Sequence, residues 1–364
     1  MEMWLQIKPM DTLLFRDATI FDKGMSNIIE SRRMPYPSVL YGAICTALME
    51  RGNLKELRNI LIDKEPSKKE LENKLQQSLK LKEVYMVKKN ELYIPAPMDL
   101  FVDKLGKPYK GDFRDGVLYL AKLCEENKKL KSVQGKYINF YDFLEEYPRK
   151  EGARFSIYEE NFFWSEYQKI GLEIDPKTYK NKERYLYHVN MLEGNDNDIS
   201  YLVNISLPGE VEKIKDWKTP IFLGGMARVA FLQQKTEDDP NVKLIKEYKE
   251  LKNETDIVKL IFTQPVIFNQ NSNEIVKKEL PYSNRKITVI GRAVGKPEYI
   301  GGFDMALKKE KEIQEGIPAG SVFLLKSEKF KGCTNKKIIE FLEEELEKII
   351  EQPYRGFGNF LITE

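Results

Sequence analysis

"MWLQIKPMDTLLFRDATIFDKG" (residues 3–24) and "SVLYGAICTALMER" (residues 38–51) decide the fold of the N-terminal part of this chain. Met3 to Ile7 alternates well enough to predict a short β-strand. The apolar residues of 38–51 recur at a spacing of three to four, which predicts a helix with Ser38 as its N-cap and Gly52 as its C-terminal stop. A strand, a long loop and a helix open a βαβ-type unit.

Similar elements recur along the rest of the chain. Further strands are predicted at 83–88, 92–94, 168–174, 184–192, 199–207, within 219–233, and at 257–268, 287–293, 321–326 and 359–363. Helices are predicted near 55–80 and, with clear amphipathicity, at 335–351. Strand pairs with intervening helices describe a βαββαβ arrangement, so we predict an α+β fold with two ferredoxin-like (RRM-like) domains in tandem.

The domain boundaries follow from length and charge. A chain of 364 residues exceeds the usual single domain, and the highly charged stretch around "KTEDDPN" is its best boundary. We predict an N-terminal domain at 1–237, a charged linker with a helix at 238–256, and a C-terminal domain at 257–364 that ends in a glycine-rich loop. Within the first domain, the aromatic runs of 104–165 predict an inserted helical or irregular lobe rather than regular sheet.

Composition narrows the class of protein. Lys and Arg number 59 against 57 Asp and Glu, a net charge of +2, so any anion-binding surface must be regional. The three cysteines form no CxxC pair, which argues against a zinc ribbon or a disulfide framework and suits a reducing compartment. No run of about 18 apolar residues occurs. We therefore expect a soluble, cytoplasmic protein without contact to a membrane.

Catalytic signatures are sparse in this sequence. The single histidine, His188, lies in "YLYHVNML", which alternates like a strand, so we interpret it as a structural or surface residue rather than a general base. No HExxH, GxxxxGK[ST] or GxGxxG motif occurs. We expect neither catalytic residues nor a metal or other cofactor.

Three glycine clusters give the positive signal: "LGGMAR" (223–228), "IGRAVGKPEYIGGFD" (290–304) and "PYRGFGNFLI" (353–362). Glycines let a backbone approach closely, arginine binds phosphate, and aromatic rings stack on bases, so together the clusters predict a sequence-tolerant RNA groove. The last cluster nearly matches the RNP1 pattern, but the interposed Asn359 favours a glycine loop leading into a strand. The alternative, ordinary turns and bulges, stays open for each cluster taken alone.

The segment before the first helix offers further RNA contacts. Arg32 and Arg33 lie close to the predicted helix N-terminus, where Ser38 and the first free N–H groups could hold a phosphate. Tyr36 and Tyr41 are candidates for base stacking.

The preceding loop has a different interpretation. We expect Arg16 to pair with Asp11 or Asp17 and so to brace the loop, while Leu13 to Phe15 hold it against the core.

These segments, taken in order, resemble a known family, the repeat-associated mysterious proteins (RAMPs) of CRISPR systems, and specifically the third subunit of the type III-B Cmr effector complex. The resemblance rests on "PMDTLLFRDATIFDKG", "PYPSVLYGAICTAL", "LYIPAPMDL", "LGGMAR", "IGGFD", "IPAGSVFLL" and "RGFG", which follow one another between residues 9 and 358. The opening motif favours Cmr over the equivalent subunit of the type III-A complex, without excluding the latter.

The resemblance implies a fold and a function. Members of the family are similar to fused ferredoxin-like domains without nuclease activity of their own. They hold the 5′ repeat-derived handle of the CRISPR guide RNA, dock on the large polymerase-like subunit and adjoin a backbone RAMP subunit. Carried onto this sequence, with the stacking and capping candidates above, the RNA-binding residues would be Arg32, Arg33, Tyr36, Ser38, Tyr41, Gly224, Gly225, Arg228, Arg292, Gly301, Gly302, Arg355, Gly356, Phe357 and Gly358.

Two other functions remain open at this point. One is a RAMP endoribonuclease that processes repeat RNA with His188 or a lysine as its general base. The other is an adaptor that contacts only proteins.

Overall fold

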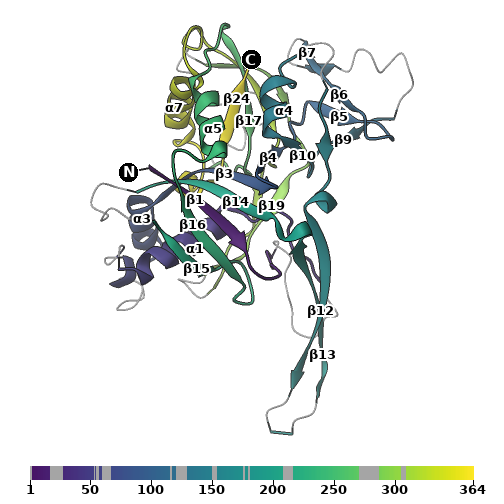
Figure 1. Ribbon diagram of the computed structural model, residues 1–364, viewed down its shortest axis with the longest axis vertical. Coiled ribbons are helices and arrows are strands. Elements are labelled where there is room, and N and C mark those ends of the chain that lie inside the picture. Colours follow the sequence, from purple (N-terminus) through teal and green to yellow (C-terminus); the bar gives the residue numbers. More distant parts are fainter. Residues whose placement is uncertain are drawn as a thin grey trace.

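The computed structural model is built around two antiparallel sheets, one in each half of the chain (Figure 1). The described residues are 2–16, 28–52, 54, 57–59, 67–114, 117–119, 129–149, 154–174, 177–178, 181–207, 216–269, 287–304 and 309–364. We refer to residues 2–235, which contain the larger sheet, as the N-terminal half and to residues 240–364 as the C-terminal half.

The N-terminal half contains an eight-stranded sheet in the order β11-β10-β4-β3-β14-β1-β16-β15, and all its neighbouring strands are antiparallel. Its strands are β1 (Glu2–Pro9), β3 (Lys80–Lys88), β4 (Glu91–Pro95), β10 (Tyr137–Asn139), β11 (Ile157–Tyr158), β14 (Ile199–Ser206), β15 (Lys218–Phe222) and β16 (Val229–Lys235). The strands expected at 3–7, 83–88, 92–94 and 199–207 are therefore present, and the stretch 219–233 forms the β15–β16 hairpin.

Both faces of this sheet are covered. Alternate side chains of β1, such as Leu5, pack with Leu40 and Ile44 of helix α1 (Pro37–Glu50). Trp4 points to the other face and joins a second core that extends into the C-terminal half. The sheet is thus enclosed between helices on one side and the second half of the chain on the other.

The start of α1 differs from the prediction. Its N-cap is Tyr36, which makes no side-chain capping bond, and Pro37 occupies the first turn, so Ser38 lies inside the helix. Proline is favoured there because its missing N–H is one that the first turn leaves unpaired. The predicted helix of 55–80 contains α3 (Lys68–Ser78), which begins at the capping residue Ser67.

The C-terminal half contains a four-stranded antiparallel sheet in the order β18-β23-β17-β24. Its strands are β17 (Ile257–Phe262), β18 (Thr288–Ala293), β23 (Val322–Lys326) and β24 (Phe360–Thr363), and α7 (Asn335–Leu346) lies between the last two. The stretch expected to be a charged linker contains α5 (Pro240–Glu250), whose side chains Val242, Ile245 and Tyr248 are buried and belong to the shared core.

The segment expected to be an inserted irregular lobe is partly regular sheet. It contains strands β6 (Pro108–Lys110), β7 (Asp112–Arg114), β8 (Val117–Tyr119), β9 (Lys131–Ser132), β10 and β11, the helix α4 (Phe140–Glu145) and the short helix η1 (Glu160–Phe162). Strand β5 (Leu100–Val102), just before this segment, pairs with β6 and β9. Because β10 pairs with β4, and β11 with β10, part of this segment extends the main sheet. The expectation that no regular sheet occurs there was wrong for these strands.

A long hairpin projects from the body of the molecule (Figure 1). Its strands are β12 (Trp164–Ile174) and β13 (Asn181–Gly194), and β2 (Ile28–Ile29) pairs with β13 in parallel. Val189 and Met191 of β13 pack on Leu14 of the opening loop, which holds the base of the hairpin.

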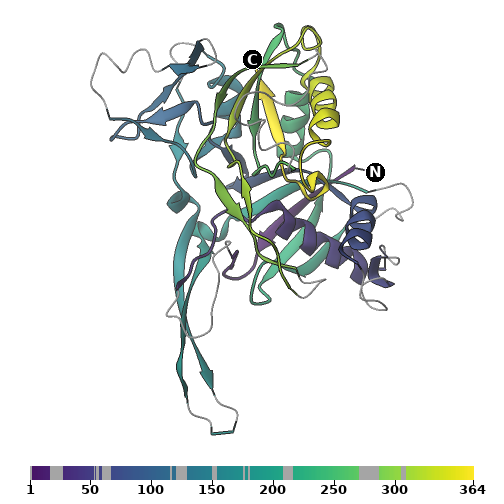
Figure 2. The same ribbon diagram turned by 180° about the vertical axis from the view of Figure 1, so that it is seen from behind.

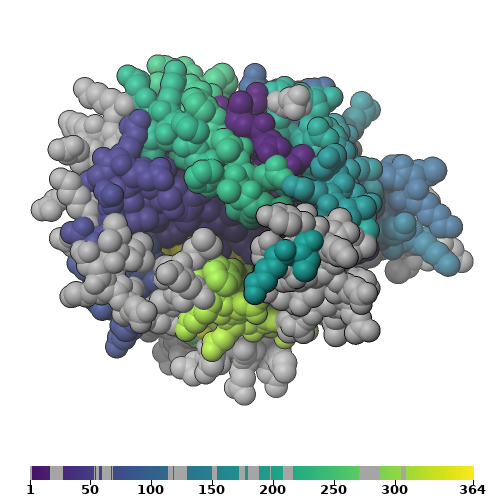
Figure 3. Space-filling view, turned by 90° about the horizontal axis from the view of Figure 1, so that it is seen from below, coloured from purple at the N-terminus to yellow at the C-terminus, as the bar shows by residue number. Residues whose placement is uncertain are grey.

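Short strands complete the C-terminal half. They are β19 (Glu298–Ile300), β20 (Phe303–Asp304), β21 (Lys309–Glu310) and β22 (Gln314–Gly316), and β19 pairs with β22. Figure 2 shows this yellow-green segment crossing from the C-terminal half to lie beside N-terminal residues drawn in purple, and Figure 3 shows its atoms next to purple ones on the surface. Within the described part of the chain, no helix has both the length and the apolar character needed to cross a membrane.

Candidate nucleic-acid interface

A cavity of about 430 Å³ lies where the two halves meet, and it contains two of the predicted site residues, Arg32 and Arg33. The N-terminal half contributes 30–35 and 134–137, and the C-terminal half contributes 263–265. Pro95, Glu160, Glu298 and Ala319 complete the lining. We call this space the junction cavity.

Arg32 is held by an ion pair and by an aromatic ring. Its Nη2 lies 2.7 Å from Oε2 of Glu298, and its guanidinium stacks 4.0 Å from the centre of the Tyr36 ring. Burial alone would lower the pKa of Arg32, but Glu298 and then Tyr36 raise it above its ordinary value. The guanidinium is therefore charged and fixed in one orientation.

Arg33 lies at the base of the hairpin. It forms ion pairs with Glu166 of β12 and, at 3.4 Å, with Glu160. Burial lowers the pKa of Arg33, and the two carboxylates more than compensate, so that its pKa is raised.

Two hydrogen-bond donors in the lining lack partners among the described residues. They are Nε of Arg32 and Nε2 of Gln264, both buried, whereas Nε of Arg33 lies 3.4 Å from the Glu160 carboxylate. Gln264 is only 1% exposed. Buried donors are nearly always satisfied, so two unsatisfied ones in the lining of one cavity mark it as a candidate binding site.

The C-terminal glycine loop positions this wall of the cavity. The carbonyl oxygen of Asn359 accepts hydrogen bonds from the backbone N–H groups of Thr263 (2.8 Å) and Gln264 (3.3 Å). The N–H of Gly358 donates to the Pro265 carbonyl at 2.9 Å. Gly358 has φ +74°, and an added Cβ would lie 2.5 Å from Ile350, so glycine is required there. The glycine loop therefore supports the cavity from behind.

The other predicted residues of that loop are also buried. Arg355, Gly356 and Phe357 pack inside, and a Cβ on Gly356 would lie 2.4 Å from Leu81. The guanidinium of Arg355 lies 5.5 Å from the ring centre of Tyr354. As expected, the loop leads into a strand, β24.

The two tyrosines predicted to stack on bases are core residues. Tyr36 is 3% exposed and donates to the Tyr299 carbonyl, and Tyr41 is 2% exposed and donates to the Leu75 carbonyl. Neither ring offers a free face in this structure. The Tyr36 ring instead supports the guanidinium of Arg32, which stacks on it.

"LGGMAR" forms the turn between β15 and β16 and packs on the opening loop. Gly224 has φ +76°, and a Cβ there would lie 2.5 Å from the Leu14 carbonyl, while the N–H of Gly225 donates to that carbonyl at 2.8 Å. Arg228 forms an ion pair with Asp11, which lowers the pKa of Asp11. Arg228 thus takes the place beside Asp11 that the prediction gave to Arg16. The alternative partner Asp17 lies outside the described residues.

The middle glycine cluster reaches the junction cavity through Glu298, but its predicted glycines and its arginine do not line the cavity. Gly301 and Gly302 follow β19 directly, and Gly302 has φ +123° with open space beside it. Arg292 is exposed on β18, opposite Phe323. Of the predicted residues, the junction cavity therefore brings together Arg32 and Arg33 with Tyr36 beneath, while the rest support the surrounding loops or lie elsewhere.

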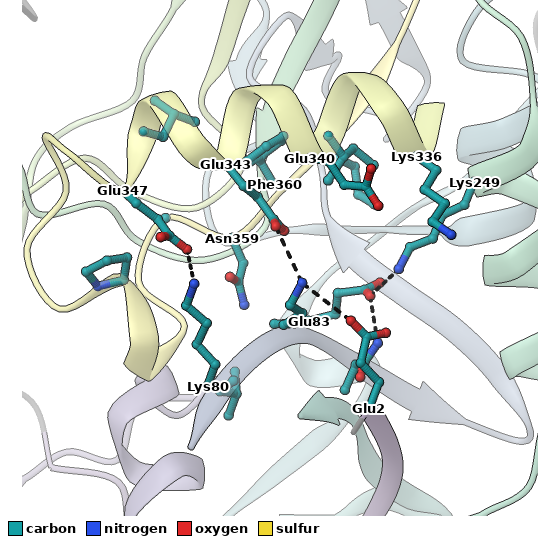
Figure 4. A pocket seen from close by; sticks show the side chains of 18 of the residues that line it. Glu2, Lys80, Glu83, Lys249, Lys336, Glu340, Glu343, Glu347, Asn359 and Phe360 are labelled. Atoms are coloured by element: carbon teal, nitrogen blue, oxygen red, sulfur yellow. Dashed lines mark hydrogen bonds and ion pairs between the residues drawn. The ribbon is translucent and has the colours of Figure 1, made fainter. Parts of the chain in front are cut away.

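A larger cavity of about 540 Å³ lies on the other side of the glycine loop (Figure 4). Ion pairs cross it between the halves: Lys80 with Glu347, Lys82 with Glu343, and Lys249 with Glu83. Burial raises the pKa of Glu343. Because acidic residues outnumber lysines in its lining, this cavity is unsuited to a phosphate.

His188 lies in the β13 ladder, opposite Ile170 of β12 and Ile28 of β2. Its Nδ1 is 3.5 Å from Nε2 of Gln168, and no carboxylate within the described ranges bonds to it. Over the described ranges, no group of three or more His, Cys, Asp or Glu side chains is placed to hold a metal ion.

Sequence reasoning missed Gln264, Glu298 and Tyr137 of the junction cavity. Gln264 and Tyr137 lie in "TQP" and "KYI", which carry no recognisable motif, whereas Glu298 lies inside the glycine cluster 290–304 but is neither a glycine nor an arginine of it. The role of all three residues depends on contacts between distant segments, which the local sequence does not specify.

Comparisons with known proteins agree with this architecture. The chain matches, at 19% identity and a TM-score of 0.50, a chain of a structure described as a type III-B Cmr-beta bound to cognate target RNA and AMPPnP, over 97% of this chain and 91% of that one. A second structure, of the type III-B Cmr-beta bound to cognate target RNA, matches at 18% identity and a TM-score of 0.50 over 94% and 89% of the two chains. No curated protein matches the sequence. A family model described as CRISPR-associated protein (Cas_Cmr3) matches residues 5–364, so this chain belongs to the Cas_Cmr3 family of CRISPR-associated proteins.

Proposed function

We propose that this chain is a non-catalytic RNA-binding subunit of a type III-B effector complex in the cytoplasm. It grips the 5′ repeat-derived handle of the guide RNA, docks on the large polymerase-like subunit and adjoins a backbone RAMP subunit. The observation that carries the proposal is the junction cavity, which two arginines line at the meeting of the two halves and in which Arg32 and Gln264 have unsatisfied donors.

The arginines suit a role in RNA binding. Arg32 is fixed by Glu298 and Tyr36, so little side-chain entropy would be lost when it binds. The lining is balanced between the cations Arg32, Arg33 and Lys136 and the anions Glu30, Glu160 and Glu298. Recognition there would depend on shape and hydrogen bonds more than on net charge, as is common for single-stranded RNA.

Strand order supports the tandem ferredoxin-like fold as part of this proposal. In the C-terminal half the order β24-β17-β23-β18 reads 4-1-3-2, and in the N-terminal half β16-β1-β14-β3 reads the same. All these neighbours are antiparallel. This is the order expected when two βαβ units interlock in one sheet.

The projecting hairpin supports a role inside a larger assembly. Tyr167 and Ile170 of β12 and Ile28 of β2 are exposed at its base. Apolar side chains on a projecting ribbon are costly in isolation and are covered when a neighbouring subunit binds.

A titration with guide RNA tests the proposal. The complex is reconstituted with this chain and the large subunit, and its affinity for guides with and without the handle is measured by filter binding over a range of salt concentrations. We expect tighter binding of the handle-bearing guide and a steep decrease of affinity with salt. Equal affinity for both guides would contradict handle recognition.

A nuclease assay tests the enzymatic alternative. Purified protein is incubated with repeat RNA in EDTA, beside its His188→Ala variant. We expect no cleavage by either protein, and cleavage that is lost in the variant would identify an endoribonuclease.

A further inference from the structure

Two lysines share one buried carboxylate where residues 99–147 meet strand β17. Lys259 of β17 forms an ion pair with Asp99 at 2.8 Å, and the hydroxyl of Tyr147 donates to the same carboxylate at 2.8 Å. Lys110, the last residue of β6, donates from its Nζ to the backbone carbonyl of Tyr147. The Nζ atoms of Lys110 and Lys259 lie 4.5 Å and 5.0 Å from the centre of the Tyr147 ring. Two amino groups are therefore gathered around one ring and one carboxylate.

The charges of this cluster are unequal. Asp99 is fully buried and already accepts from Lys259 and Tyr147. Asp112, the other carboxylate that acts on Lys110, is exposed on β7, where water weakens its effect. Two ammonium groups that are partly removed from water repel each other and favour the loss of one proton. Lys110 has the weaker partners, and burial, followed by the charge of Lys259, lowers its pKa to about 8.

Lys110 is also the member of the cluster that solvent reaches best. Asp99 and Tyr147 are 0% exposed and Lys259 is 9% exposed, whereas Lys110 is only half-buried. An ordinary lysine is uncharged in only about one molecule in a thousand near neutral pH. A second cation beside a partly desolvated lysine is one of the ways in which proteins make such an amine nucleophilic.

We propose that the Nζ of Lys110 is an acylation site that reacts with small acyl phosphates. A small donor is required because the amine is half-buried, and an anionic one is favoured by the charge of Lys259. The lone pair of Nζ attacks the acyl carbon and an N–C bond forms. The C–O bond to the phosphate breaks, its electron pair leaves with inorganic phosphate, and the amine proton passes to water. The product is a neutral amide, which leaves Lys259 as the cationic partner of Asp99.

Acetylation with limiting acetyl phosphate tests this inference. The purified chain is treated at several pH values between about 7 and 10.5, and the acetylated fraction of each lysine is measured by mass spectrometry of its peptides. Lys104 is the internal reference, because it is an exposed lysine in the turn that leads into β6. Near neutral pH we expect Lys110 to react about 10-fold faster than Lys104, because a larger fraction of it is uncharged. The rate of Lys110 should level off above about pH 8, whereas that of Lys104 keeps rising.

Two variants show whether Lys259 activates Lys110. Lys259→Met removes the neighbouring cation and leaves the Asp99 carboxylate to Lys110, so the rate of Lys110 near neutral pH should fall to about that of Lys104. Lys326→Met is the matched control, because it removes a lysine from the neighbouring strand β23 whose ion pair with Asp256 lies at the surface. It should leave the rate of Lys110 unchanged. If Lys259→Met does not fold, the pH profile of the wild type decides alone.

The results that would overturn the inference are distinct. Equal rates for Lys110 and Lys104 near neutral pH, or a rate of Lys110 that rises in parallel with that of Lys104 up to about pH 10, would make Lys110 an ordinary lysine. Acetylation of Lys110 only after unfolding in urea would show that the folded chain denies the reagent access. RNA takes no part in the reaction, so neither result affects the proposed function.

Discussion

Asp99 and Lys259 form a buried ion pair that joins the two halves of the molecule. Oδ2 of Asp99 lies 2.8 Å from Nζ of Lys259, and Asp99 is 0% exposed. Asp99 ends the "PAPMD" stretch of the N-terminal half, and Lys259 lies in the middle of β17. The hydroxyl of Tyr147 also donates to the Asp99 carboxylate at 2.8 Å.

Removing one member of this pair leaves a buried charge without its partner. We expect Asp99→Asn and Lys259→Met each to lower the free energy of unfolding by about 3–5 kcal/mol, and the double variant to lose less than the sum. Urea unfolding of the four proteins measures this coupling. Asp11→Asn is the control, because the pair of Asp11 with Arg228 lies at the surface and should contribute less than about 1 kcal/mol. Equal losses for Asp11→Asn and Asp99→Asn would contradict the buried pair.

Lys110 gives the protein a pH dependence in the alkaline range. Burial, and then the charge of Lys259, lowers the pKa of Lys110 to about 8. Between pH 8 and about 10.5 the unfolded chain keeps this proton and the folded chain does not, so stability rises with pH over that window. We expect a gain on the order of 2 kcal/mol in the wild type relative to Lys110→Met, measured by urea unfolding at several pH values. Parallel pH profiles for the two proteins would exclude this role of Lys110.

Gly224 is required for space as well as for its backbone angle. Gly332 has nearly the same φ (+74° against +76°) but nothing within 4 Å of an added Cβ, whereas a Cβ on Gly224 would lie 2.5 Å from the Leu14 carbonyl. Gly332→Ala should therefore lower the free energy of unfolding by about 1 kcal/mol, from backbone strain alone. Gly224→Ala should lower it by about 2 kcal/mol more. Thermal unfolding of the two variants compares them directly. Similar losses would mean that the opening loop can move away from the turn.

Glu298 limits the positive charge of the junction cavity. Glu298→Gln keeps the shape of the side chain but removes the charge that Arg32 faces at 2.7 Å. We expect the complex with this variant to bind guide RNA more tightly and with a steeper salt dependence, because one more cation becomes available to the RNA. Glu310→Gln, at an exposed position on β21, is the control for the change in net charge. If both variants alter affinity equally, Arg32 is not near the RNA.

Local sequence patterns predicted the regular elements well. Alternation in residues 3–7 and the helical period of 38–51 depend on neighbours in the chain, and both reappear in β1 and α1. The N-cap was misassigned by two residues, because the helix begins at Pro37 and its N-cap is Tyr36 rather than Ser38. The two strands of the hairpin were predicted as separate strands. That they pair and project from the body could not be predicted, because it depends on how the rest of the chain packs.

The candidate site was predicted only in part. Arg32 and Arg33 were identified because charged residues before a helix are a recognisable signal, and the structure places both in the junction cavity. Tyr36 and Tyr41 were predicted to stack on bases because they are aromatic residues near the same helix start, but both are buried by the surrounding segments. Gln264 gave no signal, since its position depends on hydrogen bonds between Thr263, Gln264 and the distant Asn359.

Photo-crosslinking from the handle tests the central claim most directly. The complex is assembled with guides that carry a single 4-thiouridine at each handle position, irradiated, and analysed by mass spectrometry for the crosslinked peptides. Handle recognition by this chain predicts crosslinks to its segments 30–36 and 263–265, and their loss when the thiouridine is moved beyond the handle. Handle crosslinks that fall only on other subunits would contradict it.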